Sequence, residues 1–189
     1  MADIKQAVAY VLRQEDSTLS GVITNYANDH GGLTRFGLTA RYHPELIAQG
    51  FFDASMPASQ ALPLAEKTYE TAYGPQLFIP VLSSQGIATA LLSFAVNQGN
   101  GPAVLKLQKA VNAVDGNILI ADGRMGPGTV AAINRTDSGK LVAAWQPLEE
   151  AFYQDIATRD PSQKGNLKGW LNRVAANMKL CVEAELSTT

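Results

Sequence analysis

Residues 87–96, which read IATALLSFAV, limit most strongly how this chain can fold. A helix over this stretch would be apolar on almost every face, and such a helix is stable only when other elements surround it. We therefore expect it to lie at the centre of a mostly α-helical protein, packed on all sides by the segments that precede and follow it.

The composition is that of an ordinary globular protein. A chain of 189 residues with 46% hydrophobic residues can bury a sizeable core. The net charge of −2 and the lack of any basic run argue against nucleic acid as a partner. Cys181 is the only cysteine, and His30 and His43 are the only histidines, so we expect no internal disulfide, metal site or cofactor.

Helical periodicity and turn residues predict the remaining elements. Between the first two predicted helices, polar and glycine-rich sequence predicts a small β-hairpin at about residues 21–36, and residues 51–62 are predicted to be a loop. The predicted helices cover residues 3–15, 44–50, 64–73, 102–113, 130–134, 139–159 and a last segment from residue 168.

Glu15 is the first candidate for chemistry. It follows Ile4 by eleven residues, almost three whole helical turns, so its carboxylate shares a face with Ile4 and Val8. A carboxylate on an apolar face is partly desolvated, which favours the protonated form that a general acid needs. It is also the only glutamate in the first 44 residues. A glutamate at a helix end is nevertheless more often a solvated surface residue.

Residues 29–39, DHGGLTRFGLT, carry a more specific signal. They resemble the D-x-G-G-x-T-x-[YF]-G-[IL]-T signature of the glycoside hydrolase 108 muramidases, which occur in phage endolysins and related bacterial lysozymes. In that family a glutamate ends the first helix, typically as E-G-G-Y, whereas here Glu15 precedes Asp-Ser-Thr. The resemblance implies a lysozyme-like helical fold with a small β-hairpin near the active site.

The same resemblance implies roles for individual residues. Glu15 would be the catalytic acid, Asp29 the second carboxylate and Thr34 a hydroxyl that positions water. An equally good interpretation of Asp29 is an Asx-turn or a helix N-cap. The residues expected to contact substrate are Tyr26, Asn28, Arg35, Phe36, Asn97 and Gln98.

Three further segments resemble parts of the same family. Asn97 ends a stretch similar to the family's D-x-A-V-N-x-G segment, where it would line the cleft or simply cap the buried helix. Tyr69 lies in a stretch similar to the family's A-x-x-x-Y-x-x-Y pattern, and we interpret it as a core residue. The motif GWLNR at residues 169–173 resembles the family's C-terminal part; we interpret Trp170 as a core anchor and Arg173 as a salt-bridge or capping residue.

Residues 122–129, DGRMGPGT, resemble small peptidoglycan-binding modules. The structural alternative is a tight turn followed by a helix that Thr129 caps. We expect residues 1–85 to form the lysozyme-like catalytic part and residues 86–189 a helical peptidoglycan-binding part, packed together as one body.

The predicted function is therefore an N-acetylmuramidase that acts on bacterial peptidoglycan as a monomer. Without a signal peptide or a membrane-length apolar run, it would accumulate in the host cytoplasm before a separate route releases it to the periplasm or wall, as a phage endolysin. Three alternatives remain open: a lytic transglycosylase, a non-catalytic wall-binding module and a phage tail component.

Overall fold

The computed structural model describes residues 1–25 and 32–186, and these residues are mostly α-helical, as predicted. Short 3₁₀ helices, η1 (Ile79–Val81) and η2 (Pro161–Asn166), lie between longer elements, and strands β1 (Thr34–Arg35) and β2 (Leu38–Thr39) pair antiparallel. The α-helices are α1 (Ile4–Glu15), α2 (Pro44–Ile47), α3 (Ala58–Ala72), α4 (Gln85–Gln98), α5 (Asn100–Asp115), α6 (Pro127–Arg135), α7 (Ser138–Arg159) and α8 (Leu167–Leu186).

The chain forms two compact units. One is Val8–Ala72, and the other combines Met1–Ala7 with Tyr73–Thr189. We call them the N-terminal and the C-terminal unit. The functional division expected between residues 85 and 86 is a different boundary and stays a prediction. None of the helices in the described parts of the chain combines the length and the apolar character that crossing a bilayer requires.

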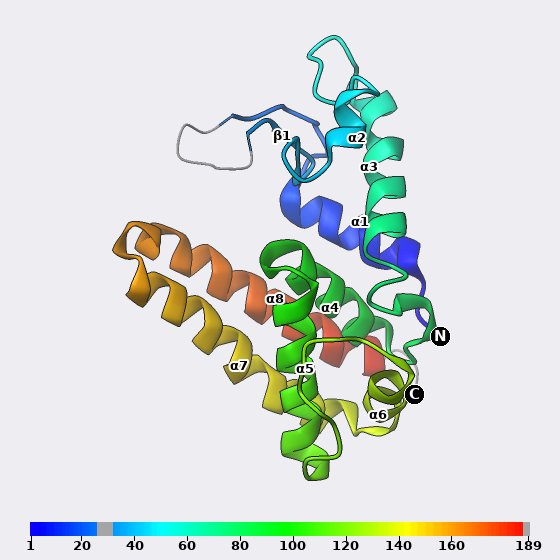
Figure 1. Ribbon diagram of the computed structural model, residues 1–189, viewed down its shortest axis with the longest axis vertical. Coiled ribbons are helices and arrows are strands. Elements are labelled where there is room, and N and C mark those ends of the chain that lie inside the picture. Colours follow the sequence, from blue (N-terminus) through cyan, green and yellow to red (C-terminus); the bar gives the residue numbers. More distant parts are fainter. Residues whose placement is uncertain (26–31, 187–189) are drawn as a thin grey trace. The chain divides into compact units, whose positions relative to one another are not determined.

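Helix α4 is buried within the C-terminal unit, as its apolar sequence predicts. Residues 86–95 are all buried, and α4 packs against both α5 and α8. Helix α7 packs against the same two helices (Figure 1), so four helices share one core. Trp145 of α7 is fully buried, with its ring edge-on to Phe94 of α4 at 5.2 Å between centroids.

Gly86 lets α4 and α8 approach closely. A Cβ atom at this position would lie 2.6 Å from the Cα atom of Cys181, which is less than real carbon contacts allow. Further along the same helix pair, the buried amide of Asn177 donates a hydrogen bond to the hydroxyl of Ser93 at 3.0 Å. The contact between the two helices therefore depends on small residues in α4.

Two helices begin at least three residues earlier than the sequence predicts, and the other predicted starts are within about two residues. Helix α3 begins at Ala58, six residues early, and contains Pro63. The prediction placed residues 51–62 in a loop and began the helix at residue 64. Pro63, which has no backbone N–H to donate, instead lies in the second turn of α3. Helix α6 begins after Gly126, so Thr129 lies inside it and does not cap it. The Thr129 hydroxyl instead accepts a hydrogen bond from the buried Gln108 amide at 3.3 Å.

The small sheet of the N-terminal unit lies later in the chain than predicted. Its turn is Phe36-Gly37, whose φ angles of 49° and 76° are both positive, as in the type I′ turns that join short strands. Thr34 also pairs with Thr24 across an isolated antiparallel bridge. The prediction relied on the apolar residues near position 22, whereas the turn residues decide where the strands pair.

Arg35 lies inside the N-terminal unit, with 4% of its surface exposed. Its guanidinium donates hydrogen bonds to the carbonyl oxygens of Gly21, Phe51 and Met56 at 2.8–2.9 Å. Burial lowers the pKa of Arg35 from its usual value. One side chain thus connects three loop segments that are separated by up to 35 residues of sequence, as the spacing of Gly21 and Met56 shows.

We predict that Gly86→Ala destabilises the protein. The added methyl group has to push against α8 backbone, and such overpacking costs about 1–3 kcal/mol. The matched control is Gly128→Ala in α6, where a Cβ meets nothing within 4 Å. There the change should be neutral or stabilise by about 0.4–1 kcal/mol. Urea unfolding of both variants measures the difference, and equal stabilities would contradict the close approach.

Arg35→Lys should destabilise the fold by about 1–3 kcal/mol, because an ammonium cannot serve three carbonyls as the planar guanidinium does. Thermal and urea unfolding measure this loss. The control is Arg41→Lys at an exposed position, where a change within about 0.5 kcal/mol is expected. Equal effects of the two substitutions would show that the buried contacts of Arg35 contribute nothing.

Candidate active site

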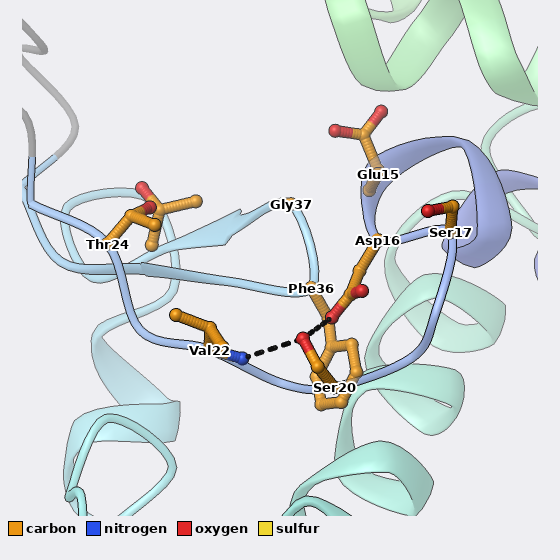
Figure 2. Close-up of a pocket in the computed structure, with 9 residues that line it drawn as sticks. Glu15, Asp16, Ser17, Ser20, Val22, Thr24, Phe36 and Gly37 are labelled. Atoms are coloured by element: carbon orange, nitrogen blue, oxygen red, sulfur yellow. Dashed lines mark hydrogen bonds between the residues drawn. The ribbon is translucent and has the colours of Figure 1, made fainter.

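Glu15 is the last residue of α1 and borders a pocket of about 340 Å³ within the N-terminal unit (Figure 2). The helix ends here because the chain turns sharply through Asp16 to Ser20, where Leu19 has a positive φ of 53°. The side chain of Glu15 is half-buried. The pocket is lined by Glu15, Asp16, Ser17, Ser20, Val22, Thr24, Thr34, Phe36 and Gly37.

Gly37 gives the Glu15 side chain its place beside the hairpin turn. A Cβ atom on Gly37 would lie 2.6 Å from Cγ of Glu15 and 2.7 Å from the hydroxyl of Tyr69. That hydroxyl donates a hydrogen bond to the carbonyl oxygen of Phe36 at 2.9 Å and so holds the turn in place. Tyr69 is fully buried, which confirms it as a core residue. Glycine at this position therefore meets both a steric and a conformational requirement.

Asp16 is the residue that sequence reasoning missed. Its carboxylate accepts hydrogen bonds from the backbone N–H of Gly21 at 2.7 Å and from the hydroxyls of Ser20 and Thr18 at 3.0 and 3.1 Å. Burial raises the pKa of Asp16, but these hydrogen bonds outweigh it and lower that pKa below the usual value of 3.8. A short polar run after a helix is a signal for such local bonding, although a weak one.

The two neighbouring carboxylates therefore differ in what they can do. Figure 2 shows them pointing in different directions, with Asp16 turned toward Ser20. Asp16 is ionised and serves as an acceptor for its own loop, whereas Glu15 faces a polar pocket with threonine hydroxyls in its wall. Across the described residues, no group of three or more His, Cys, Asp or Glu side chains is placed to hold a metal ion.

The predicted site residues in this unit fall into three groups. Thr34 and Phe36 line the pocket together with Glu15. Arg35 does not line it, and its contacts with three carbonyls give it a structural position instead of the expected substrate contact. The predicted residues Tyr26, Asn28 and Asp29 lie outside the described residues.

Asn97 and Gln98 belong to the C-terminal unit and have different surroundings. Asn97 is exposed and borders a second pocket, which also contains Trp170 and Arg173. Gln98 points into a buried cluster, where its amide donates to the carboxylate of Glu149 at 2.7 Å. Gln98 is half-buried, and this hydrogen bond gives its amide a structural partner, so the substrate contact expected of it stays a prediction.

Glu149 is fully buried. It has the shifted pKa that is common in catalytic carboxylates, but substrate cannot reach it. Burial raises its pKa to about 7, against the opposing charge of Lys106 at 3.6 Å. Its other oxygen accepts a hydrogen bond from the indole N–H of Trp145 at 2.9 Å. Strongly shifted pKa values often mark active sites. With none of its surface exposed, however, Glu149 cannot meet a polymeric substrate.

The raised pKa of Glu149 predicts a specific pH dependence of stability. Below pH 4.5 this carboxyl is protonated in both states, and its contribution is fully present. As the pH rises toward about 7, the unfolded chain releases a proton that the folded protein retains, so the free energy of unfolding falls. Glu149→Gln should remove this part of the pH dependence. Urea unfolding at several pH values tests this prediction. The control is Glu150→Gln on the same helix, which should leave the pH dependence of the free energy of unfolding unchanged.

The comparisons with known proteins bear on the family and the fold of this chain. Residues 8–99 match the model of the glycosyl hydrolase 108 family, and residues 102–175 match a model described as a predicted peptidoglycan domain. No curated protein sequence matches the chain significantly. The solved structure of SagA from Brucella abortus is similar in fold, with a TM-score of 0.69 and 23% identity over 95% of this chain and 94% of that one. The chain is therefore a glycoside hydrolase with a glycosyl hydrolase 108 domain over residues 8–99, followed by a peptidoglycan domain over residues 102–175.

Proposed function

We propose that this protein is an N-acetylmuramidase that hydrolyses the β-1,4 bond between N-acetylmuramic acid and N-acetylglucosamine, with Glu15 as its general acid. The observation that carries the proposal is the place of Glu15 at the end of α1, on a polar pocket that Thr34, Phe36 and Gly37 of the family signature also line. The match to the hydrolase family covers both parts of this pocket.

In this mechanism Glu15 delivers its proton to the glycosidic oxygen as the bond to the sugar carbon breaks. Charge then develops on an oxocarbenium-like carbon, which a second group must stabilise or a water must attack. Thr34 lies on the pocket wall, where its hydroxyl can hold such a water. Asp29 remains our proposal for the second carboxylate, on the strength of the sequence resemblance.

Asp16 is excluded as the acid by its own hydrogen bonds. A carboxylate that accepts from one backbone N–H and two hydroxyls is stabilised in its ionised form, so it holds no proton to give near neutral pH. It is, however, well suited to keep the loop after α1 in one conformation. We therefore assign Asp16 a positioning role beside the catalytic Glu15.

The substrate is the peptidoglycan of the bacterial wall, and we propose that the C-terminal unit contributes to holding it. The match to a peptidoglycan domain over residues 102–175 supports this. A phage endolysin, released from the host cytoplasm to the wall by a separate route and acting as a bacteriolytic monomer, is the biological setting that the sequence resemblance favours.

Glu15→Gln is the direct test of this proposal. The amide has nearly the shape of the carboxyl but cannot donate the proton, and loss of general acid catalysis costs on the order of 10²–10⁴-fold in rate. The measurement is the fall in turbidity of purified sacculi, together with a circular dichroism spectrum to show that the fold is kept.

The matched control is Asp16→Asn, one residue further along the chain. It makes the same chemical change on the same pocket, but the amide oxygen can still accept a hydrogen bond from the Gly21 N–H. We expect a smaller loss of rate than for Glu15→Gln, accompanied by lower stability. A folded Glu15→Gln protein that clears sacculi at nearly the original rate would show that the acid is another residue.

A further inference from the structure

The pocket around Trp170 in the C-terminal unit differs from what the sequence predicted for this residue. Trp170 is not a core anchor; it is half-buried in the first turn of α8. It borders a pocket of about 330 Å³ whose lining residues are Asn97, Gly165, Asn166, Gly169, Trp170 and Arg173. The residues come from α4, η2 and α8, so the tertiary fold of this unit assembles the pocket.

The indole of Trp170 is held in place by the rings beneath it. It stacks on Tyr153, with 5.3 Å between centroids and 25° between the ring planes. Tyr153 is itself buried and packs edge-on against Phe152 at 5.2 Å. Because one indole face is covered by Tyr153, the accessible part of the indole belongs to the other face and its edge. The ring thus offers a rigid aromatic surface next to the pocket.

The polar groups of the pocket are amides and a guanidinium. Asn97 and Asn166 each carry both a donor and an acceptor, and Arg173 carries several donors in one plane. The amide of Asn166 is oriented by a hydrogen bond to Gln163 at 2.9 Å. The aspartates and glutamates of the described chain contribute no side chain to this lining, so its only formal charge is that of Arg173.

This combination fits a pyranose ring with an N-acetyl group. The face of an aromatic ring carries partial negative charge, which attracts the C–H-rich face of a sugar. Planar amides and a guanidinium match hydroxyls and an acetamido oxygen, which are neutral acceptors and donors at fixed spacing. A pocket of about 330 Å³ has room for one such residue, with the rest of a glycan strand continuing into solvent.

We propose that the Trp170 pocket is a binding subsite for an N-acetylated hexosamine of the glycan strand. The residues of this subsite all belong to the C-terminal unit, whereas those of the pocket that Glu15 borders belong to the N-terminal unit. It rests on the proposed function in one respect, namely that the glycan strand of peptidoglycan is the natural ligand. Its purpose is to hold the polymer by its sugars, independently of the proton transfer.

The probe is chitotetraose, a soluble β-1,4 oligomer of N-acetylglucosamine, added to full-length Glu15→Gln protein so that hydrolysis does not interfere. The chain contains two tryptophans, and Trp145 is fully buried, so a saturable change in tryptophan emission reports on Trp170. We expect such a change. Its absence at millimolar sugar, with the protein folded, would overturn the proposal.

Variants measured by calorimetry in the same Glu15→Gln background locate the binding. Trp170→Ala should raise the Kd about tenfold, and Trp170→Phe, which keeps a ring on Tyr153, by a smaller factor. Asn166→Ala should raise it roughly fivefold through the lost hydrogen bond. The matched control is Asn172→Ala, at an exposed position of α8 that does not border the pocket. Unchanged affinity in both Trp170→Phe and Asn166→Ala would contradict the subsite, whether or not Trp170→Ala folds.

The outcomes separate this proposal from the proposed function. One outcome is that the unchanged protein clears sacculi while substitutions at Trp170 and Asn166 leave its affinity for chitotetraose unchanged. That outcome would refute the subsite alone. Sugar binding that depends on them, together with no clearing of sacculi, would refute the proposed hydrolysis alone. Binding of a soluble stem tripeptide, competing for the pocket in place of chitotetraose, would assign Arg173 to a carboxylate and overturn the sugar assignment.

Discussion

The buried guanidinium of Arg35 is the interaction on which the geometry of the N-terminal unit depends. Its hydrogen bonds to the carbonyl oxygens of Gly21, Phe51 and Met56 join the loop after α1 to the segment before α3. Burying a charge is costly unless hydrogen bonds compensate it. Here the compensation also ties together irregular backbone segments, each of which otherwise has mainly local backbone hydrogen bonds. The pocket beside Glu15 is bounded by this same loop.

Three carboxylates illustrate how environment, and not residue type, decides chemistry in this protein. Asp16 is held ionised by a backbone N–H and two hydroxyls. Burial raises the pKa of Glu149 to about 7 against the opposing charge of Lys106, and the same burial keeps Glu149 away from any substrate. Glu15 and Asp16 both lie half-buried on the same polar pocket, but the hydrogen bonds of Asp16 commit it to its own loop, so Glu15 is the carboxylate that we assign to proton donation.

The parts of the fold that follow local rules could be predicted from the sequence. The all-round apolar character of residues 87–96 predicted the burial of α4, and Glu15 could be singled out because few glutamates compete with it near the family signature. What could not be predicted depends on contacts distant in sequence. Arg35 read as a polar site residue because the three carbonyls that surround it are 14–21 residues away. Trp170 was predicted to be a core residue because large aromatic side chains are usually buried. Its stacking on Tyr153 is a tertiary contact, which the sequence alone does not reveal.

Mass spectrometry of the fragments released from purified sacculi tests the central claim, hydrolysis of the glycan strand through Glu15, most directly. The account predicts muropeptides that end in reducing N-acetylmuramic acid, formed by the unchanged protein and nearly absent with Glu15→Gln. Fragments that end in anhydromuramic acid would contradict it, because they require a transglycosylase reaction without attack by water. Sacculi that bind the folded protein and release no fragments would contradict it too, because the protein would then hold the wall without cutting it.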